Sequence, residues 1–215
     1  LGEESPPGEY LDESGQPAGV TIDLVKELLR RQGKKASIRI LPWKRAYAMG
    51  LSERNVVLME TTRTAERETR FKWVGPILVV NRIVYGKEDY GKDLRSVADL
   101  PQAGVICVLR GSSNESYLHS LGLANVVAVT KPSQCLRMLK IDRVALFYTS
   151  EIGMAGLLKE QGGTHGPYIA VLNLKKEYLY LAFSRDVSDA RIQSWQAALE
   201  AAKNDGTVAR IYTGV

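Results

Sequence analysis

The chain has 215 residues, of which 45% are hydrophobic and 25% are charged, and its formal net charge is +5. This length suits one large domain or two small ones, with a core that needs no metal or disulfide for stability. The lysines and arginines are dispersed and form no block typical of a nucleic-acid-binding arm, so we expect no nucleic-acid partner. No apolar run approaches the ~18 residues of a membrane-spanning helix, and no signal peptide is recognised, so we interpret the chain as a mature or trimmed form.

Cysteines and histidines are too few for a structural zinc site. The chain has two cysteines, Cys107 and Cys135, no C-x-x-C pair, and two histidines, His119 and His165. We therefore expect neither a metal nor a cofactor. The cysteines either form one disulfide in an oxidising compartment or lie in the core as small apolar residues, and the sequence leaves both alternatives open.

In chain order, the first part of the sequence alternates short helices with short strands. A tight turn at 12–17 precedes a helix at 21–31, whose apolar residues recur at helical spacing until Gly33 ends it. Beyond it, the patterns predict strands at 37–41, 56–59 and 77–85 and a helix at 44–51.

From Lys92 the alternation starts again, so a second set of α/β units follows the first. Strands separated by helices indicate mostly parallel sheets. The helix at 133–140 is predicted to begin with Ser133 as its cap, after Pro132. The remaining predictions are strands at 105–109, 126–129, 144–147, 168–172 and 178–183, and helices at 97–101, 116–121, 150–160, 189–203 and 208–212.

Threonines and arginines crowd residues 61–70, directly after the apolar strand at 56–59. Thr64 is predicted to cap a short helical turn that carries Arg67. Hydroxyls and a guanidinium at the end of a strand suit a small anion, because the guanidinium fork matches a carboxylate bidentately. The alternative is a solvated, charged turn.

Ligands of open α/β sheets bind beyond the carboxyl ends of the strands. Two loops have this position in the predicted element order, residues 60–67 in the first set and 110–114 in the second. We expect them to form a binding site together.

Several motifs resemble those of one known family, in the same order along nearly the whole chain. Thr62-Arg63-Thr64-Ala65-Glu66-Arg67 matches its Thr-x-Thr-x-Glu-Arg signature, and residues 71–76 match the segment that follows. Gly111-Ser112-Ser113 stands where the family has Gly-Thr-Thr or Gly-Ser-Ser, and residues 205–212 match its C-terminal Asp-Gly-Thr signature. The chain thus resembles a type II periplasmic solute-binding protein, of the branch that binds polar amino acids for ABC transporters.

The resemblance implies an α/β fold of two lobes, joined by two crossover strands, with a central cleft. Lobe one would comprise residues 1–86 and 183–215, and lobe two residues 87–182. The expected function is periplasmic binding of a small polar solute, an amino acid or related carboxylate, between lobes that close on it. The chain would be a monomer without enzymatic activity, and an ABC transporter permease is its candidate partner.

The resemblance also assigns residues to the ligand. Arg67 stands where the family clamps a carboxylate and Thr62 where a hydroxyl assists it, while Ser112 and Ser113 would reach the same carboxylate from lobe two. The bland alternatives are that Arg67 is a surface arginine of the turn and that both serines only cap the following helix.

The chain departs from the family at the positions that surround a ligand ammonium and side chain. Ser150 stands near Tyr148, at a strand end where amino-acid binders carry an aspartate, and Glu151 follows it. Either Glu60 supplies the missing carboxylate from lobe one or the ligand lacks an ammonium. In the N-terminal loop Glu4 and its neighbours replace an aromatic that often covers the ligand, and Trp43 and Tyr47 are the candidates to stack on it instead. The alternative for Trp43 is an aromatic of the core or of the lobe edge.

Two other functions stay open. Some relatives on this fold are dehydratases of cyclohexadienyl compounds, which would use Glu60 or Glu151 in acid–base chemistry, although no acid–base pair is evident. The chain also fits a ligand-sensing domain cut from a larger receptor.

Overall fold

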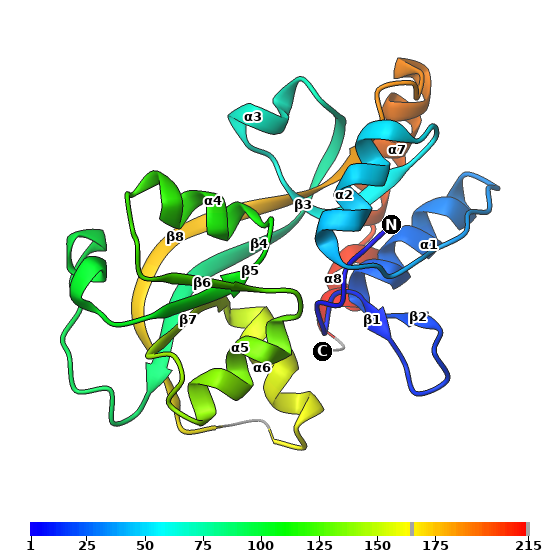
Figure 1. Cartoon of the computed structure of the whole chain (residues 1–215). Helices are drawn as coiled ribbons and strands as arrows, with labels where there is room; N and C mark the ends of the chain where they lie inside the picture. Colours follow the sequence, from blue (N-terminus) through cyan, green and yellow to red (C-terminus); the bar gives the residue numbers. More distant parts are fainter. Residues whose placement is uncertain (164–165, 214–215) are drawn as a thin grey trace. The chain divides into compact units, whose positions relative to one another are not determined.

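A computed structural model describes residues 1–163 and 166–213 (Figure 1). The chain divides into two compact units. Unit 1 combines Leu1–Val79 with Tyr178–Val215, and unit 2 is the continuous stretch Val80–Glu177. Two long strands, β4 (Lys72–Lys87) and β8 (Tyr168–Phe183), each contribute residues to both units.

Unit 1 is built around β3 (Val57–Thr62), which pairs antiparallel with the C-terminal half of β8. Helix α1 (Val20–Arg31) packs against α7 and α8, and α2 packs against β3. The apolar stripe of α1 is buried as its spacing predicts, with Ile22 and Leu28 fully inaccessible. The other elements of unit 1 are β1 (Tyr10–Leu11), β2 (Pro17–Ala18), α2 (Trp43–Ser52), α3 (Ala65–Glu68), α7 (Asp189–Asn204) and α8 (Thr207–Thr213).

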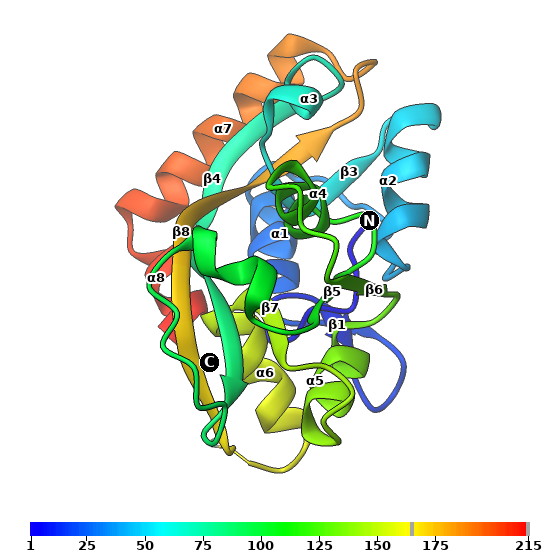
Figure 2. The same cartoon turned by 60° about the vertical axis from the view of Figure 1, so that its left-hand side comes forward.

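Unit 2 is a sheet with helices on both faces. Strand β5 (Ile106–Leu109) lies parallel to β6 (Val126–Val129) and β7 (Leu146–Ser150), and β7 pairs antiparallel with β4. Figure 2 shows α4 on one face and α5 and α6 on the other, and a separate apolar cluster fills each face. The helices are η1 (Val97–Gln102), α4 (Ser113–Ser120), α5 (Pro132–Lys140) and α6 (Glu151–Glu160).

Three local predictions were wrong. Residues 37–41 form no strand and contribute only an isolated bridge between Ile40 and Gly2. The reason is that, within the described part of the chain, Gly2 alone bonds to the backbone of this segment, through its amide and its carbonyl oxygen, and no neighbouring residues continue the pairing. Helix α5 starts at Pro132, which suits the first helical position, so Lys131 rather than Ser133 is the cap residue. The two strands predicted at 168–172 and 178–183 are one strand, β8, because the polar residues between them stay in the extended chain.

The two cysteines form a disulfide. Cys107 on β5 and Cys135 on α5 are bonded, with their Cα atoms 5.5 Å apart, and both side chains are fully buried. The bond therefore lies inside the apolar cluster between the sheet and α5 and α6. Of the two alternatives left open by the sequence, the disulfide is the one that the structure contains. Disulfides form and persist in oxidising compartments.

Candidate functional site

The end of β3 and the turn after it place Arg67 inside unit 1. The backbone of β3 is irregular between Leu58 and Thr61, where Glu60 has a φ of 45°. The Thr64 hydroxyl then accepts a hydrogen bond from the Arg67 amide at 3.3 Å and starts α3, as predicted. Arg67 lies on this single turn and is buried, with only 7% of the residue exposed.

The Arg67 guanidinium lies against an aromatic wall. Its Cζ is 5.2 Å from the ring centroid of Trp43 and 5.1 Å from that of Tyr47. Its Nη1 donates to the Thr62 carbonyl oxygen at 3.3 Å. A cation held over aromatic faces and shielded from water attracts anions more strongly than a solvated one. The interpretation of Arg67 as a surface arginine is therefore wrong.

A second arginine of the same turn shows the contrast. Arg63 forms a salt bridge with Glu68 at 2.5 Å and is 41% exposed, with its Cζ over the rings of Trp73 and Tyr180. Its charge is already neutralised by a carboxylate and faces water. Arg67 and Arg63 thus differ in burial, although they are only four residues apart.

Glu60 contacts the N-terminal part of unit 1. Its Oε1 accepts a hydrogen bond from the Thr21 hydroxyl at 2.5 Å. Gly8 makes room for this carboxylate, since a Cβ at that position would lie 2.0 Å from Oε1. Glu9 is buried beside it, and burial and the charge of Glu60 raise the pKa of Glu9 well above its ordinary value. The half-buried Glu4 lies in the same N-terminal segment.

The two serines of unit 2 lie at the start of α4. The Ser112 hydroxyl accepts from the Glu115 amide at 3.2 Å and donates to the Leu109 carbonyl at 2.6 Å, so Ser112 is the helix cap. Ser113 is the first residue of the helix and is half-buried. Ser112 therefore caps α4, as the alternative to a ligand contact requires, and this role needs no ligand.

The residues at the end of β7 have partners within unit 2. Ser150 is buried and caps α6, where its hydroxyl accepts from the Gly153 amide at 3.0 Å. The Glu151 carboxylate accepts from the Asn81 amide at 2.7 Å and from the Asn81 side chain at 3.0 Å. Tyr148 is 1% exposed and belongs to the core on the α4 face, where burial raises its hydroxyl pKa.

Sequence reasoning missed a charged cluster of unit 2. Arg82 on β4 and Lys175 on β8 both bind the carboxylate of Glu177, at 2.5 Å and 3.0 Å. The Lys175 amine also lies 4.5 Å from the centroid of Tyr117. The available signal was the presence of opposite charges in two otherwise apolar strand runs.

Within residues 1–163 and 166–213, no three His, Cys, Asp or Glu side chains gather as metal ligands would. His119 is exposed on α4, and His165 falls outside the described residues. Over the same residues no helix is long and apolar enough to cross a membrane.

A model of the family described as bacterial extracellular solute-binding proteins, family 3, matches residues 1–214. The chain belongs to this family. Membership confirms the resemblance read from the motifs, and the α/β fold class is confirmed with it.

One curated protein and several solved structures are similar to most of the chain. The L-cystine-binding protein TcyA of Bacillus subtilis is 24% identical over 193 residues, which cover 90% of this chain and 70% of TcyA. A histidine kinase sensor domain with similarity to periplasmic binding proteins superposes with a TM-score of 0.90 at 19% identity, over 99% of this chain and 92% of that one. An ancestral amino acid-binding protein, described as a precursor of cyclohexadienyl dehydratase, gives a TM-score of 0.82 at 20% identity, over 99% and 92%. At these identities the two structures establish the fold alone.

Proposed function

We propose that the protein binds a small carboxylate-bearing solute outside the cytoplasm, with Arg67 as the carboxylate clamp, and delivers it to an ABC transporter permease. The observation that carries the proposal is the buried guanidinium of Arg67 over Trp43 and Tyr47. Arginine suits this task because its planar fork pairs with both carboxylate oxygens and keeps its charge at all physiological pH values.

The proposed solute is an amino acid or a related carboxylate. Family membership and the cystine-binding name of one relative support this class. Thr62, 7% exposed at the end of β3, is proposed as the assisting hydroxyl, and Ser112 and Ser113 as contacts from unit 2. The sequence also predicts ligand contacts by Trp43, Tyr148, Glu60 and Glu4, and these stay predictions. The division into lobes at 1–86 plus 183–215 and at 87–182 is likewise a prediction.

A ligand screen with two matched arginine variants tests the clamp. Thermal shift followed by calorimetry would compare L-cystine, other polar amino acids and small mono- and dicarboxylates on the wild-type chain. For the best ligand, Arg67→Ala is expected to weaken binding by about 30-fold or more, because losing one partner of a desolvated charge pair costs ~2 kcal/mol or more. Arg63→Ala, four residues away and already paired with Glu68, is expected to change the affinity less than about threefold. Unchanged affinity in a folded Arg67→Ala variant refutes the clamp.

Ligand sensing within a receptor is the second candidate function. It is favoured by the TM-score of 0.90 with a histidine kinase sensor domain. The full gene product decides between the two, since a receptor continues into a membrane-spanning segment and a signalling domain. Turnover of prephenate-like acids by the purified protein would overturn the proposal that the chain is not an enzyme.

A further inference from the structure

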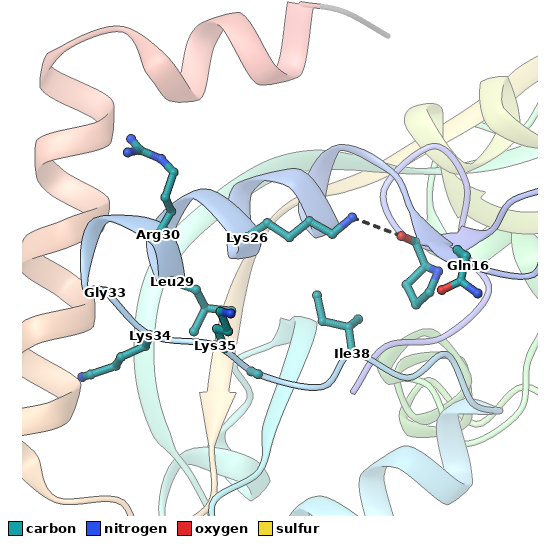
Figure 3. A pocket seen from close by; sticks show the side chains of 10 residues that line it. Gln16, Lys26, Leu29, Arg30, Gly33, Lys34, Lys35 and Ile38 are labelled. Carbon is teal, nitrogen blue, oxygen red and sulfur yellow. Dashed lines mark hydrogen bonds between the residues drawn. The ribbon is translucent and has the colours of Figure 1, made fainter.

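An open groove of about 740 Å³ lies on unit 1 (Figure 3). Its lining residues fall between positions 16 and 38 and do not include Arg67. One wall is the face of α1 that carries Lys26 and Leu29, and the other is the segment after α1 that ends at Ile38. Its size falls within the range of small-molecule sites in proteins, about 300–1,000 Å³. The lining residues are Gln16, Pro17, Lys26, Leu29, Arg30, Gly33, Lys34, Lys35, Ala36 and Ile38.

The charged side chains of the groove are all basic. Four of the lining residues are lysine or arginine and none is acidic. Arg30 is neutralised by Glu27 at 2.7 Å, but Lys26, Lys34 and Lys35 form no ion pair within the part of the chain that the structure describes. Lys26 Nζ lies 3.4 Å from the Pro17 carbonyl oxygen, a weak contact with a neutral group. The groove therefore carries uncompensated positive charge.

The groove also has an apolar floor. Ile38 and Pro17 line it together with Leu29, of which only 6% is exposed. Pro17 pairs across the β1–β2 hairpin with Leu11, which is 46% exposed. Apolar side chains beside unpaired ammonium groups favour a ligand that has both a hydrophobic body and a negative head.

The side chains do not contribute equally. In Figure 3, Lys26 extends along the groove towards Pro17 and Ile38 points into the space below it, whereas Arg30 and Lys34 point away. Lys26 is therefore placed to meet the head of a ligand whose body lies on Ile38. Lys34, next to Lys35 in sequence, serves as a matched control that carries the same charge but faces elsewhere.

We propose that this groove is a binding site for an amphipathic carboxylate, a short aliphatic chain whose carboxylate pairs with Lys26 while Lys35 adds positive charge to the same groove. The hydrocarbon covers Ile38 and Pro17, which are both partly exposed, and its burial supplies about 25 cal/mol per Å² of apolar surface removed from water. The site is independent of Arg67 and of the solute proposed above.

Calorimetric titration with octanoate, below the concentration at which it forms micelles, tests the site. The wild-type chain is expected to bind octanoate and to bind 1-octanol at least fivefold more weakly, because the alcohol has no charge. Lys26→Gln with Lys35→Gln is expected to weaken octanoate binding by roughly five- to tenfold, since exposed ion pairs contribute ~0.2–1 kcal/mol each. Ile38→Ser should weaken it to a similar extent, while Lys34→Gln should leave it within twofold.

Three results would overturn the inference. They are equal binding of octanoate and 1-octanol, unchanged affinity in the Lys26→Gln/Lys35→Gln and Ile38→Ser variants, and loss of octanoate binding in Arg67→Ala. The last result would place octanoate at the arginine clamp instead. Thermal unfolding of each variant shows whether it is folded, and Lys35→Gln alone repeats the test should Lys26→Gln disturb α1.

Discussion

Arg82 and Glu177 form a buried ion pair that joins the two long strands within unit 2. The Arg82 Nε and Glu177 Oε2 atoms are 2.5 Å apart, and the side chains are 14% and 6% exposed. Burial alone would raise the pKa of Glu177, but the charges of Arg82 and Lys175 outweigh it, so the pKa is lowered. The pair lies beside the points where the chain passes from one unit to the other.

Glu177→Gln is expected to lower the free energy of unfolding by about 3 kcal/mol, because it leaves the buried Arg82 without its carboxylate. Urea unfolding at pH 7 measures this loss, with Glu88→Gln at an exposed position as the control. Replacing both partners, Arg82→Met with Glu177→Met, should recover most of it. A double variant no more stable than Glu177→Gln would show that the ion pair itself is stabilising.

The same pair gives a pH dependence. Because the folded-state pKa of Glu177 is lowered, its contribution is present above the unfolded-state value of about 4.3 and is lost as the pH falls below it. Wild-type protein should therefore lose stability between about pH 5 and pH 3, and Glu177→Gln should lose less over the same interval. Parallel curves for the two proteins would contradict the lowered pKa.

Glu9 is expected to act in the opposite direction. Its side chain is 1% exposed, and its pKa is raised first by burial and then by Glu60. A raised folded-state pKa gives stability that is complete below about 4.3 and is lost as the pH rises through the folded value. Glu9→Gln should therefore stabilise the protein at pH 8 by on the order of 1 kcal/mol, with little effect at pH 4. Thermal unfolding at both values measures this, with the exposed Glu13→Gln as control; equal effects at both pH values would refute it.

The disulfide should contribute measurably to stability. Cys107 and Cys135 are 28 residues apart in sequence, and closing a loop of that length is worth about 3.5 kcal/mol by chain entropy. Urea unfolding under a reductant is expected to show a lower midpoint than unfolding without it. The Cys107→Ala/Cys135→Ala variant should have the same urea midpoint with and without the reductant. A wild-type midpoint that ignores the reductant would contradict the prediction.

Two glycines of unit 1 offer a matched pair of substitutions. Gly19 has a φ of 118°, and a Cβ there would lie 2.3 Å from the Gly8 carbonyl oxygen, which is backbone and cannot turn aside. Gly33 has a φ of 62° and open space around it. Gly19→Ala should cost at least about 3 kcal/mol, and Gly33→Ala about 1 kcal/mol. If chemical denaturation gave similar losses of stability for the two variants, the backbone around Gly8 would have to move aside at little cost.

Sequence patterns predicted the elements whose signals are local. The apolar spacing of α1 and the Thr64 cap of α3 each depend on a few neighbouring residues, and both are confirmed. The failures are non-local: residues 37–41 alternate like a strand but lack a partner ladder, and β8 is continuous because strands on both sides pair with it. The same limit applies to the site, where the motif indicated Arg67 but not its position over Trp43 and Tyr47.

Unit 1 is assembled from the two ends of the chain, and this imposes an order on its folding. Val57 of β3 pairs with Phe183 of β8, so more than a hundred residues must be synthesised between the partners. Unit 2 is one continuous stretch and is complete in sequence before Tyr178 emerges. During synthesis, therefore, β3 stays without its β8 partner until the last strand and helices have emerged. In this interval the growing chain is most exposed to misassembly.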